Sequence, residues 1–189
     1  MEDIILVGYG GHAKSVADCI ERMGKYNIVG YTDKIQQTSV YTYLGTDEVL
    51  KEYYDKGIHN AVICIGYLGK GNVRETIYQN LKEMGFSFPV IIDPSAIVSN
   101  SAVLGEGTFV GKQAVVNACA KVGKMCIVNT GAIIEHDCVV RDFVHIAVAA
   151  VICGEVYVGK GAFLGANSVV IQCKTIEEKQ IIPAGVVVR

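Results

Sequence analysis

One histidine of this sequence stands between two acidic residues, in the run Glu135, His136 and Asp137. Histidine is the side chain that most often acts as a general base, because its pKa lies near neutral pH. A neighbouring carboxylate that hydrogen-bonds the ring fixes its tautomer and stabilises the imidazolium. The run therefore predicts a proton-transfer site with His136 as the base and Asp137 as its partner. The alternative is a surface histidine in a turn.

Three other histidines are present: His12, His59 and His145. His145 lies nine residues after His136, at a position that elsewhere in the local pattern holds an aromatic or aliphatic side chain (the aromatic ones are Phe109, Tyr157 and Phe163). A packing role is therefore an alternative to a chemical role for His145.

A glycine-rich segment, Gly8-x-Gly10-x-x-Ala13, follows the apolar residues 4–7 and precedes an amphipathic stretch. With Asp33 twenty positions after Ala13, it satisfies the loose form of the dinucleotide-binding fingerprint. In such a turn, backbone N–H groups at a helix N-terminus can approach a phosphate. His12 lies in this turn and could donate to a phosphate or a ribose, or it could be a solvent-exposed turn residue.

The first ninety residues alternate between strand and helix signals. We expect strands at residues 4–7, 27–33 and 61–66, a helix at 13–23, and a short helix at 47–54 capped by Thr46. A third helix is expected at 72–85, with four residues facing the core: Val73, Ile77, Leu81 and Met84. The alternation predicts a small Rossmann-like parallel α/β domain over residues 1–90. A dinucleotide site needs two mononucleotide-binding halves, and this domain supplies one, which suits the pyrophosphate of a nucleotide-linked sugar.

A different rule governs residues 91–189. From Ile92 to Val188 every sixth residue is Ile, Val or Leu, and the residue four positions later is mostly small. This period predicts short strands joined by turns and stacked into coils that share one aliphatic interior. Seven residues in one phase are expected at turns with unusual dihedral angles: Gly105, Gly111, Gly123, Gly159, Gly165, Asn117 and Asn129.

The six-residue pattern resembles the hexapeptide-repeat family, whose fold is a left-handed parallel β-helix with three hexapeptides in each coil. This resemblance implies five to six coils, a homotrimer, and an acyltransferase that uses acetyl-CoA or a related thioester. The motifs "VGYGGHA", "GYTD", "CIGYLGKGNVR" and "EHDC" resemble the bacterial sugar O- and N-acyltransferases. That family includes sialic acid O-acetyltransferases and acetyltransferases of UDP- or GDP-linked 4-amino sugars, which serve surface polysaccharide biosynthesis.

The resemblance to this family also implies roles for individual residues. The nucleotide sugar would be bound by Gly10, Gly11, His12, Thr32, Asp33, Gly66 and Tyr67. Acetyl-CoA, the expected co-substrate, would contact His145, Gly165, Ala166 and Asn129, and no metal is expected. His136 would be the general base and Asp137 would increase its basicity. The sugar, its nucleotide, the acyl group and the choice between oxygen and nitrogen as the acylated atom stay open.

Two other classes of function were weighed. A zinc enzyme of the γ-carbonic-anhydrase kind needs three histidine ligands, and the repeat region supplies only His136 and His145. A non-catalytic β-helix that binds or scaffolds other molecules would not need the Glu135-His136-Asp137 run. The acyltransferase interpretation is therefore preferred.

Charge and hydropathy exclude further classes. With 17 Lys and Arg against 19 Asp and Glu, and a pI near 6.1, the chain has no basic surplus for nucleic acid. The mean hydropathy is +0.35, yet no apolar run approaches the roughly 18 residues of a membrane span, so burial in a soluble protein or between subunits is expected. The acidic start, unlike a secretory signal, predicts a cytoplasmic protein. The seven cysteines form no CxxC pair, and most are expected to be small buried thiols.

Overall fold

The computed structural model describes residues 1–67 and 71–189. Contacts between residues divide the chain into two compact units. The first comprises Met1–Gly66 and Asn72–Pro89, and the second comprises Val90–Arg189 together with Tyr67 and Gly71. Residues 68–70, in the middle of the motif that begins at Cys64, lie outside the described part.

The first unit is built on a four-stranded parallel sheet. Its strands are β1 (Glu2–Val7), β2 (Tyr26–Thr32), β3 (Tyr43–Gly45) and β4 (Asn60–Ile63), in the order β3-β2-β1-β4. The side chains of Ile4, Ile5, Leu6 and Val7 have no solvent exposure, as expected of a strand covered on both faces. The predicted small α/β fold is confirmed, and β3 is an additional edge strand.

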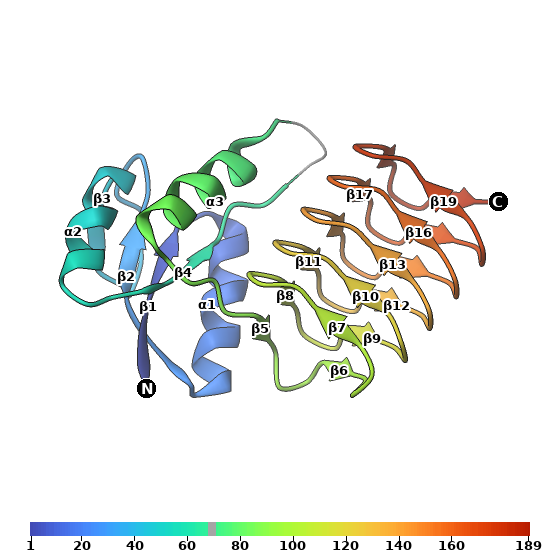
Figure 1. Ribbon diagram of the computed structural model, residues 1–189, viewed down its shortest axis with the longest axis horizontal. Coiled ribbons are helices and arrows are strands. Elements are labelled where there is room, and N and C mark those ends of the chain that lie inside the picture. The colour runs from blue at the N-terminus through green and yellow to red at the C-terminus, as the bar shows by residue number, and fades with distance from the viewer. Residues whose placement is uncertain (68–70) are drawn as a thin grey trace. The chain divides into compact units, whose positions relative to one another are not determined.

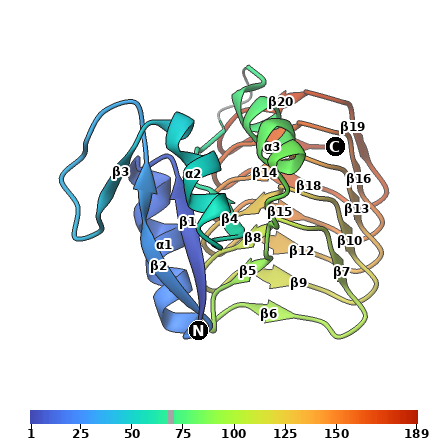
Figure 2. The same ribbon diagram turned by 60° about the vertical axis from the view of Figure 1, so that its left-hand side comes forward.

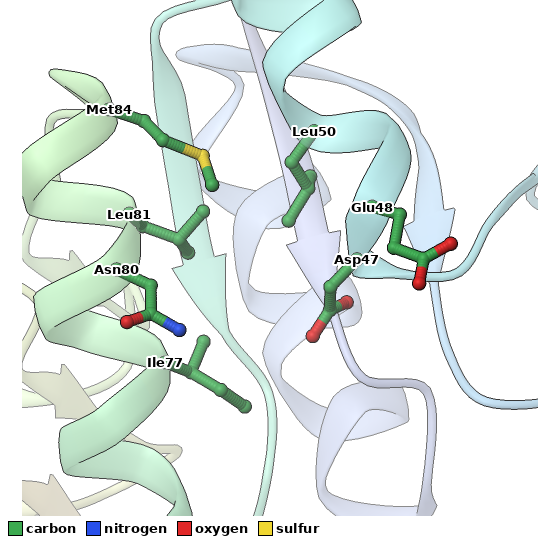
Figure 3. A pocket seen from close by; sticks show the side chains of 7 residues that line it. All are labelled: Asp47, Glu48, Leu50, Ile77, Asn80, Leu81 and Met84. Atoms are coloured by element: carbon green, nitrogen blue, oxygen red, sulfur yellow. The ribbon is translucent and has the colours of Figure 1, made fainter.

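Helices cover the two faces of this sheet. Helix α1 (Gly11–Met23) connects β1 to β2 and ends at Gly24 in the left-handed conformation. The 3₁₀ turn η1 (Asp47–Val49), helix α2 (Leu50–Asp55) and helix α3 (Val73–Met84) belong to the other half of the unit. Helix α1 lies on one face of the sheet, and α2 and α3 lie on the other, as Figure 3 shows.

Two local expectations for the helices were wrong. Thr46 precedes η1, but its side chain makes no capping hydrogen bond to the backbone. Val73 is 58% exposed, because α3 buries the stripe formed by Arg74, Tyr78 and Leu81. Ile77 and Met84 are only partly buried at the edge of that stripe.

The second unit is a parallel β-helix of two-residue strands arranged in three sheets (Figures 1 and 2). The first sheet contains β5 (Ile91–Ile92), β8 (Phe109–Val110), β11 (Ile127–Val128), β14 (His145–Ile146), β17 (Phe163–Leu164) and β20 (Ile181–Ile182). The second contains β6 (Ile97–Val98), β9 (Val115–Val116), β12 (Ile133–Ile134), β15 (Val151–Ile152), β18 (Val169–Val170) and β21 (Val187–Val188). The third contains β7 (Val103–Leu104), β10 (Lys121–Val122), β13 (Val139–Val140), β16 (Tyr157–Val158) and β19 (Thr175–Ile176).

Each strand pairs with the strand one coil further on, as Ile134 does with Ile152. The coil therefore spans three hexapeptides, as predicted. The aliphatic residues at every sixth position from Val110 to Ile182 are buried, and those at the two ends of the β-helix are partly buried. These stacked side chains form the continuous interior on which the unit depends.

The turns differ from the sequence expectation in one respect. The left-handed conformation falls two residues later than expected, for example at Gln113, Cys119 and Asp137. At the expected position, Gly105 has an ordinary φ, and a Cβ atom there would lie 2.5 Å from the carbonyl carbon of Gly123. Close stacking of successive coils therefore explains these glycines. Asn129 instead accepts a hydrogen bond from the Thr130 N–H at 2.8 Å.

All seven cysteines are free thiols: Cys19, Cys64, Cys126 and Cys138 are buried, Cys153 is partly buried, and Cys119 and Cys173 are exposed. The two exposed thiols occupy left-handed turn positions. In the described part of the chain, no helix is long and apolar enough to cross a bilayer.

Candidate active site

The predicted proton-transfer pair forms at one corner of the β-helix. His136 and Asp137 occupy the turn between β12 and β13. The Nδ1 atom of His136 lies 2.9 Å from Oδ2 of Asp137, and the two side chains are 54% and 57% exposed. A carboxylate on Nδ1 selects the tautomer with its proton there. The Nε2 atom is then the one that can accept a proton from a substrate.

The fold itself places the carboxylate beside the ring. Asp137 has φ of 61°, the left-handed conformation shared by the third turn residue of other coils. Its N–H donates to the carbonyl of Ala118, one coil away, at 3.0 Å. On the other side of His136, Glu135 accepts a hydrogen bond from Nδ2 of Asn117 at 2.8 Å. Asn117 is a site neighbour that the sequence analysis did not single out.

Acidic neighbours raise the pKa of His136. The hydrogen bond with Asp137 is the largest cause, desolvation opposes it, and the charges of Asp137, Glu135 and Glu155 add to it. The raised pKa makes His136 a stronger base than an isolated imidazole. The corner can therefore take a proton from an attacking amine or hydroxyl group.

His145 has a different environment, because it is only 6% exposed on β14. Its Nδ1 atom lies 2.5 Å from the carbonyl oxygen of Tyr67, and Nδ2 of Asn129 lies 3.4 Å from its Nε2 atom. The ring edge contacts Phe163, with ring centroids 5.2 Å apart. Both ring nitrogens of His145 therefore lie against other protein groups. This arrangement supports an orienting role for the ring, and it places Asn129 next to His145.

Tyr67 differs from expectation. Its hydroxyl group donates to the carbonyl oxygen of Gly161 at 2.9 Å, so its side chain belongs to the β-helix unit. Gly66, its neighbour in the chain, belongs to the first unit.

Asn129, Gly165 and Ala166 share one corner of the β-helix, after β11 and β17. Gly165 is buried, and a Cβ atom there would lie 2.5 Å from the backbone nitrogen of Ala184. Stacking of coils therefore accounts for Gly165, whereas Ala166 is exposed and available to a ligand.

In the first unit, four predicted residues gather where β1 and β4 end. This is the point at which the order of the parallel strands reverses, the usual ligand position in such sheets. Gly10 is the N-cap of α1 and Gly11 its first residue, and a Cβ atom at either would meet no atom within 4 Å. A Cβ atom at Gly66 would lie 3.8 Å from Cβ of His12. Open backbone N–H groups at a helix N-terminus suit a phosphate.

Asp33 follows β2 and contacts the glycine-rich turn at the same edge of the sheet. Its carboxylate accepts hydrogen bonds from the N–H of Tyr9 at 2.9 Å and of Lys34 at 2.6 Å. Thr32 differs from expectation, because it is fully buried and its hydroxyl donates to Asp47 at 2.6 Å. Asp33 is thus the residue of this pair that can reach a ligand.

A tyrosine cluster supports the glycine-rich turn, and sequence analysis missed it. The ring of Tyr9 stacks on Tyr31 with centroids 4.3 Å apart and meets Tyr41 edge-on at 5.9 Å. The Tyr41 hydroxyl donates to Glu21 of α1 at 2.6 Å, and burial raises the pKa of Tyr41. The aromatic residue between the two glycines of "GYG" was the available signal.

A cavity of about 250 Å³ lies between η1, α2 and α3 on one face of the sheet (Figure 3). Its lining consists of Asp47, Glu48, Leu50, Ile77, Asn80, Leu81 and Met84. The Asp47 side chain points towards α3, whereas Glu48 points away from it. A lining that combines apolar side chains with two carboxylates is unsuited to the phosphates of a nucleotide.

Comparison with known proteins identifies the family of this chain. Residues 3–81 match the PglD N-terminal domain family. A UDP-N-acetylbacillosamine N-acetyltransferase of Bacillus subtilis (strain 168) is 33% identical over 113 residues, which cover 58% of this chain and 51% of that protein. A variant of GDP-perosamine N-acetyltransferase from Caulobacter crescentus, solved with CoA and GDP-perosamine, is 31% identical with a TM-score of 0.94, covering 100% of this chain and 89% of the other. The chain belongs to the sugar acetyltransferase family.

Another solved structure that this chain resembles is the acetyltransferase domain of PglB from Neisseria gonorrhoeae FA1090. It is 31% identical with a TM-score of 0.93, covering 100% of this chain and 92% of that domain. The match to the B. subtilis enzyme spans about half the length of that curated relative. At the level of the family, membership confirms the predicted enzyme class, an acyltransferase with acetyl-CoA as co-substrate.

The four parallel strands of the first unit are too few for the two halves that a dinucleotide site needs, so the glycine-rich fingerprint does not indicate a complete dinucleotide site. Over residues 1–67 and 71–189, no group of three or more His, Cys, Asp or Glu side chains is arranged to hold a metal ion.

Proposed function

We propose that this protein is an acetyl-CoA-dependent N-acetyltransferase that acts on the amino group of a nucleotide-linked amino sugar. The observation that carries the proposal is the His136–Asp137 pair, joined at 2.9 Å in an exposed turn of the β-helix. An amino acceptor is preferred to a hydroxyl, as in sialic acid, because the similar proteins are named as N-acetyltransferases of amino sugars.

In the proposed reaction, the sugar nitrogen attacks the thioester carbonyl, forming a C–N bond as the C–S bond breaks. The proton leaves the nitrogen for Nε2 of His136, while Asp137 stabilises the resulting imidazolium. That proton then passes to the departing thiolate, which leaves as the free thiol of CoA. Atoms and charge balance without a metal ion or a redox partner.

We assign acetyl-CoA to the corner that contains Asn129 and the exposed Ala166. The Asn129 amide is a hydrogen-bond donor suited to a thioester or pantetheine oxygen. Its 3.4 Å approach to His145 supports a role for that ring in orienting the amide. Gly165 contributes by allowing the next coil to pack closely behind Ala166.

The nucleotide is assigned to the sheet edge in the first unit. Gly10 and Gly11 offer unobstructed backbone N–H groups to a diphosphate, and His12 lies in the first turn of the same helix. Asp33 is an acceptor for ribose hydroxyls or for the N–H groups of a base. Gly66 leaves this edge uncrowded next to His12.

We further propose a homotrimer that works in the cytoplasm, where CoA esters and nucleotide sugars are made. Apolar side chains remain exposed on the β-helix strands, among them Ile97, Val103, Ile181 and Val187. Subunit contacts would bury this surface. Sedimentation that shows an active monomer would contradict the trimer.

The decisive experiment compares the wild type with His136→Ala. Thiol release is measured with UDP-, GDP-, dTDP- and CMP-linked amino sugars, and calorimetry measures the binding of acetyl-CoA and of the best acceptor. Loss of a positioned base should lower kcat by ~10²–10⁴-fold and leave both affinities nearly unchanged. His59→Ala, an exposed histidine of the first unit, is the matched control. If the wild-type protein binds these ligands but releases no thiol, the alternative of a non-catalytic β-helix is correct.

A further inference from the structure

One turn of the β-helix departs from the others. Sixteen residues occupy the second turn position after an inward aliphatic: Pro94, Asn100, Glu106, Lys112, Ala118, Lys124, Thr130, His136, Asp142, Val148, Gly154, Lys160, Ala166, Gln172, Glu178 and Ala184. Gly154 is the only glycine of this set. Since side chains of every size are accommodated in the same position, coil geometry does not require a glycine there.

Backbone strain does not explain Gly154 either. Its φ lies outside the left-handed region, unlike that of Gly161 or Gly185. Contact with the backbone of the next coil does not explain Gly154 either. At Gly105 and Gly165, by contrast, a side chain would collide with main-chain atoms of the next coil. Around Gly154 the three nearest atoms all belong to the imidazole ring of His136.

A Cβ atom at position 154 would lie 2.6 Å from Nε2 of His136, 2.7 Å from Cε1 and 3.3 Å from Cδ2. The two residues are held one coil apart by backbone pairing, since Ile134 pairs with Ile152 and the N–H of Glu155 donates to the carbonyl of His136 at 3.0 Å. The ring therefore rests on the Cα atom of Gly154, which is buried beneath it.

We infer that Gly154 is a positioning residue for the general base: its missing side chain leaves the space in which the His136 ring lies while Nδ1 meets Asp137. This inference rests on the proposed role of His136. A methyl group at position 154 collides with the end of a rotatable side chain and not with the main chain. The expected consequence is a displaced base in an intact fold.

The size of the displacement follows from the contact distances. Ordinary van der Waals contact begins at 3.4 Å, so the ring must move by about 0.8 Å from a Cβ atom placed 2.6 Å from Nε2. A misplacement of roughly 1 Å costs on the order of 10²-fold in rate. Gly154→Ala should therefore lower kcat about 10²-fold, with little change in the KM of either substrate.

The test measures kcat, KM, melting temperature and the pKa of His136 by proton NMR, which is feasible with four histidines. In Gly154→Ala the Asp137 bond is weakened while Glu135 and Glu155 remain, so the pKa of His136 should fall, with the melting temperature nearly unchanged. Asn100→Ala, a change at the same turn position two coils away from His136, should leave kcat and this pKa unaltered. Added to His136→Ala, the Gly154→Ala change should have no further effect on kcat, because both act through one side chain.

Two results separate failure of this inference from failure of the proposed function. If His136→Ala is inactive but Gly154→Ala keeps wild-type kcat and an unshifted pKa of His136, the positioning role is wrong. If His136→Ala itself keeps wild-type turnover, the proposed base is wrong and Gly154 has no base to position. A loss of activity in Gly154→Ala that persists, at equal size, on the His136→Ala background also overturns the inference, because the effect would then be structural.

Discussion

The pairing of Asp137 with His136 predicts how the rate of acetyl transfer depends on pH. The base must be neutral to accept a proton, so kcat falls as pH drops below the pKa of His136. Asp137 raises that pKa, chiefly through the hydrogen bond at 2.9 Å. In Asp137→Asn the pKa should fall, and the acidic limb of the kcat profile should move to lower pH. The deficit of the variant relative to the wild type should therefore be largest at alkaline pH and shrink on acidification.

The magnitude of this effect follows from exposure. Both side chains are more than half exposed, and solvent screens such pairs strongly. Loss of a buried aspartate from the histidine of a serine protease costs ~10⁴-fold, chiefly through the wrong tautomer. For this exposed pair we expect a loss of roughly tenfold at the alkaline plateau, well below the ~10²–10⁴-fold cost of removing the base itself.

Glu155→Gln provides the matched control. Glu155 raises the pKa of His136 through its charge alone and is the smallest of the causes. This variant should move the acidic limb in the same direction by less, and it should keep the plateau value of kcat because the tautomer is unaffected. The measurement is a thiol-release assay at saturating substrates across the pH range. An Asp137→Asn profile that superimposes on the wild type would refute the role of Asp137.

Three further predictions concern other parts of the chain. Asp33→Asn should weaken binding of the nucleotide sugar by roughly tenfold, as expected for a hydrogen bond that involves a charged group, and leave acetyl-CoA binding unchanged in calorimetry; equal losses for both ligands would contradict the assignment of Asp33. Gly105→Ala should lower the free energy of unfolding by about 1–3 kcal/mol through overpacking, because its Cβ atom would meet the next coil at 2.5 Å; Asn100→Ala, an exposed turn residue, should melt like the wild type. His145→Ala should raise the KM for acetyl-CoA and destabilise the fold by about 1–3 kcal/mol, since the Tyr67 carbonyl loses its partner; an unchanged KM would leave His145 a packing role alone.

The β-helix was predictable because its period is local. Each hexapeptide carries its own inward aliphatic, and the same rule repeats from Ile92 to Val188 without reference to distant segments. The pairing of His136 with Asp137 was predictable for the same reason, since the two residues are neighbours in the chain. The strand β3 was missed because its three residues show no alternation and gain their order from pairing with β2.

Contacts between coils and between distant segments were harder to predict. The Tyr67 side chain reaches Gly161, 94 residues away, and no local pattern indicates this contact. Asn117 and Gly154 lie one coil before Glu135 and one coil after His136, at a separation of 18 residues. If each coil is assumed to contain three hexapeptides, a separation of 18 residues identifies Asn117 and Gly154 as neighbours of this site. The register of the β-helix was therefore sufficient to predict both contacts.

The geometry of the His136–Asp137 pair follows from a turn that many coils share. The third turn residue adopts a left-handed φ in many coils, with side chains as different as Gln113, Met125 and Phe143 at that position. The left-handed conformation of Asp137 therefore adds no backbone strain beyond that of the other turns of the β-helix. At positions 136 and 137, one turn residue with ordinary φ and one with left-handed φ place their side chains within 2.9 Å of each other. A histidine and an aspartate in these two positions are sufficient to form the pair, and the coil above must then leave space for the ring, which is the space that Gly154 provides.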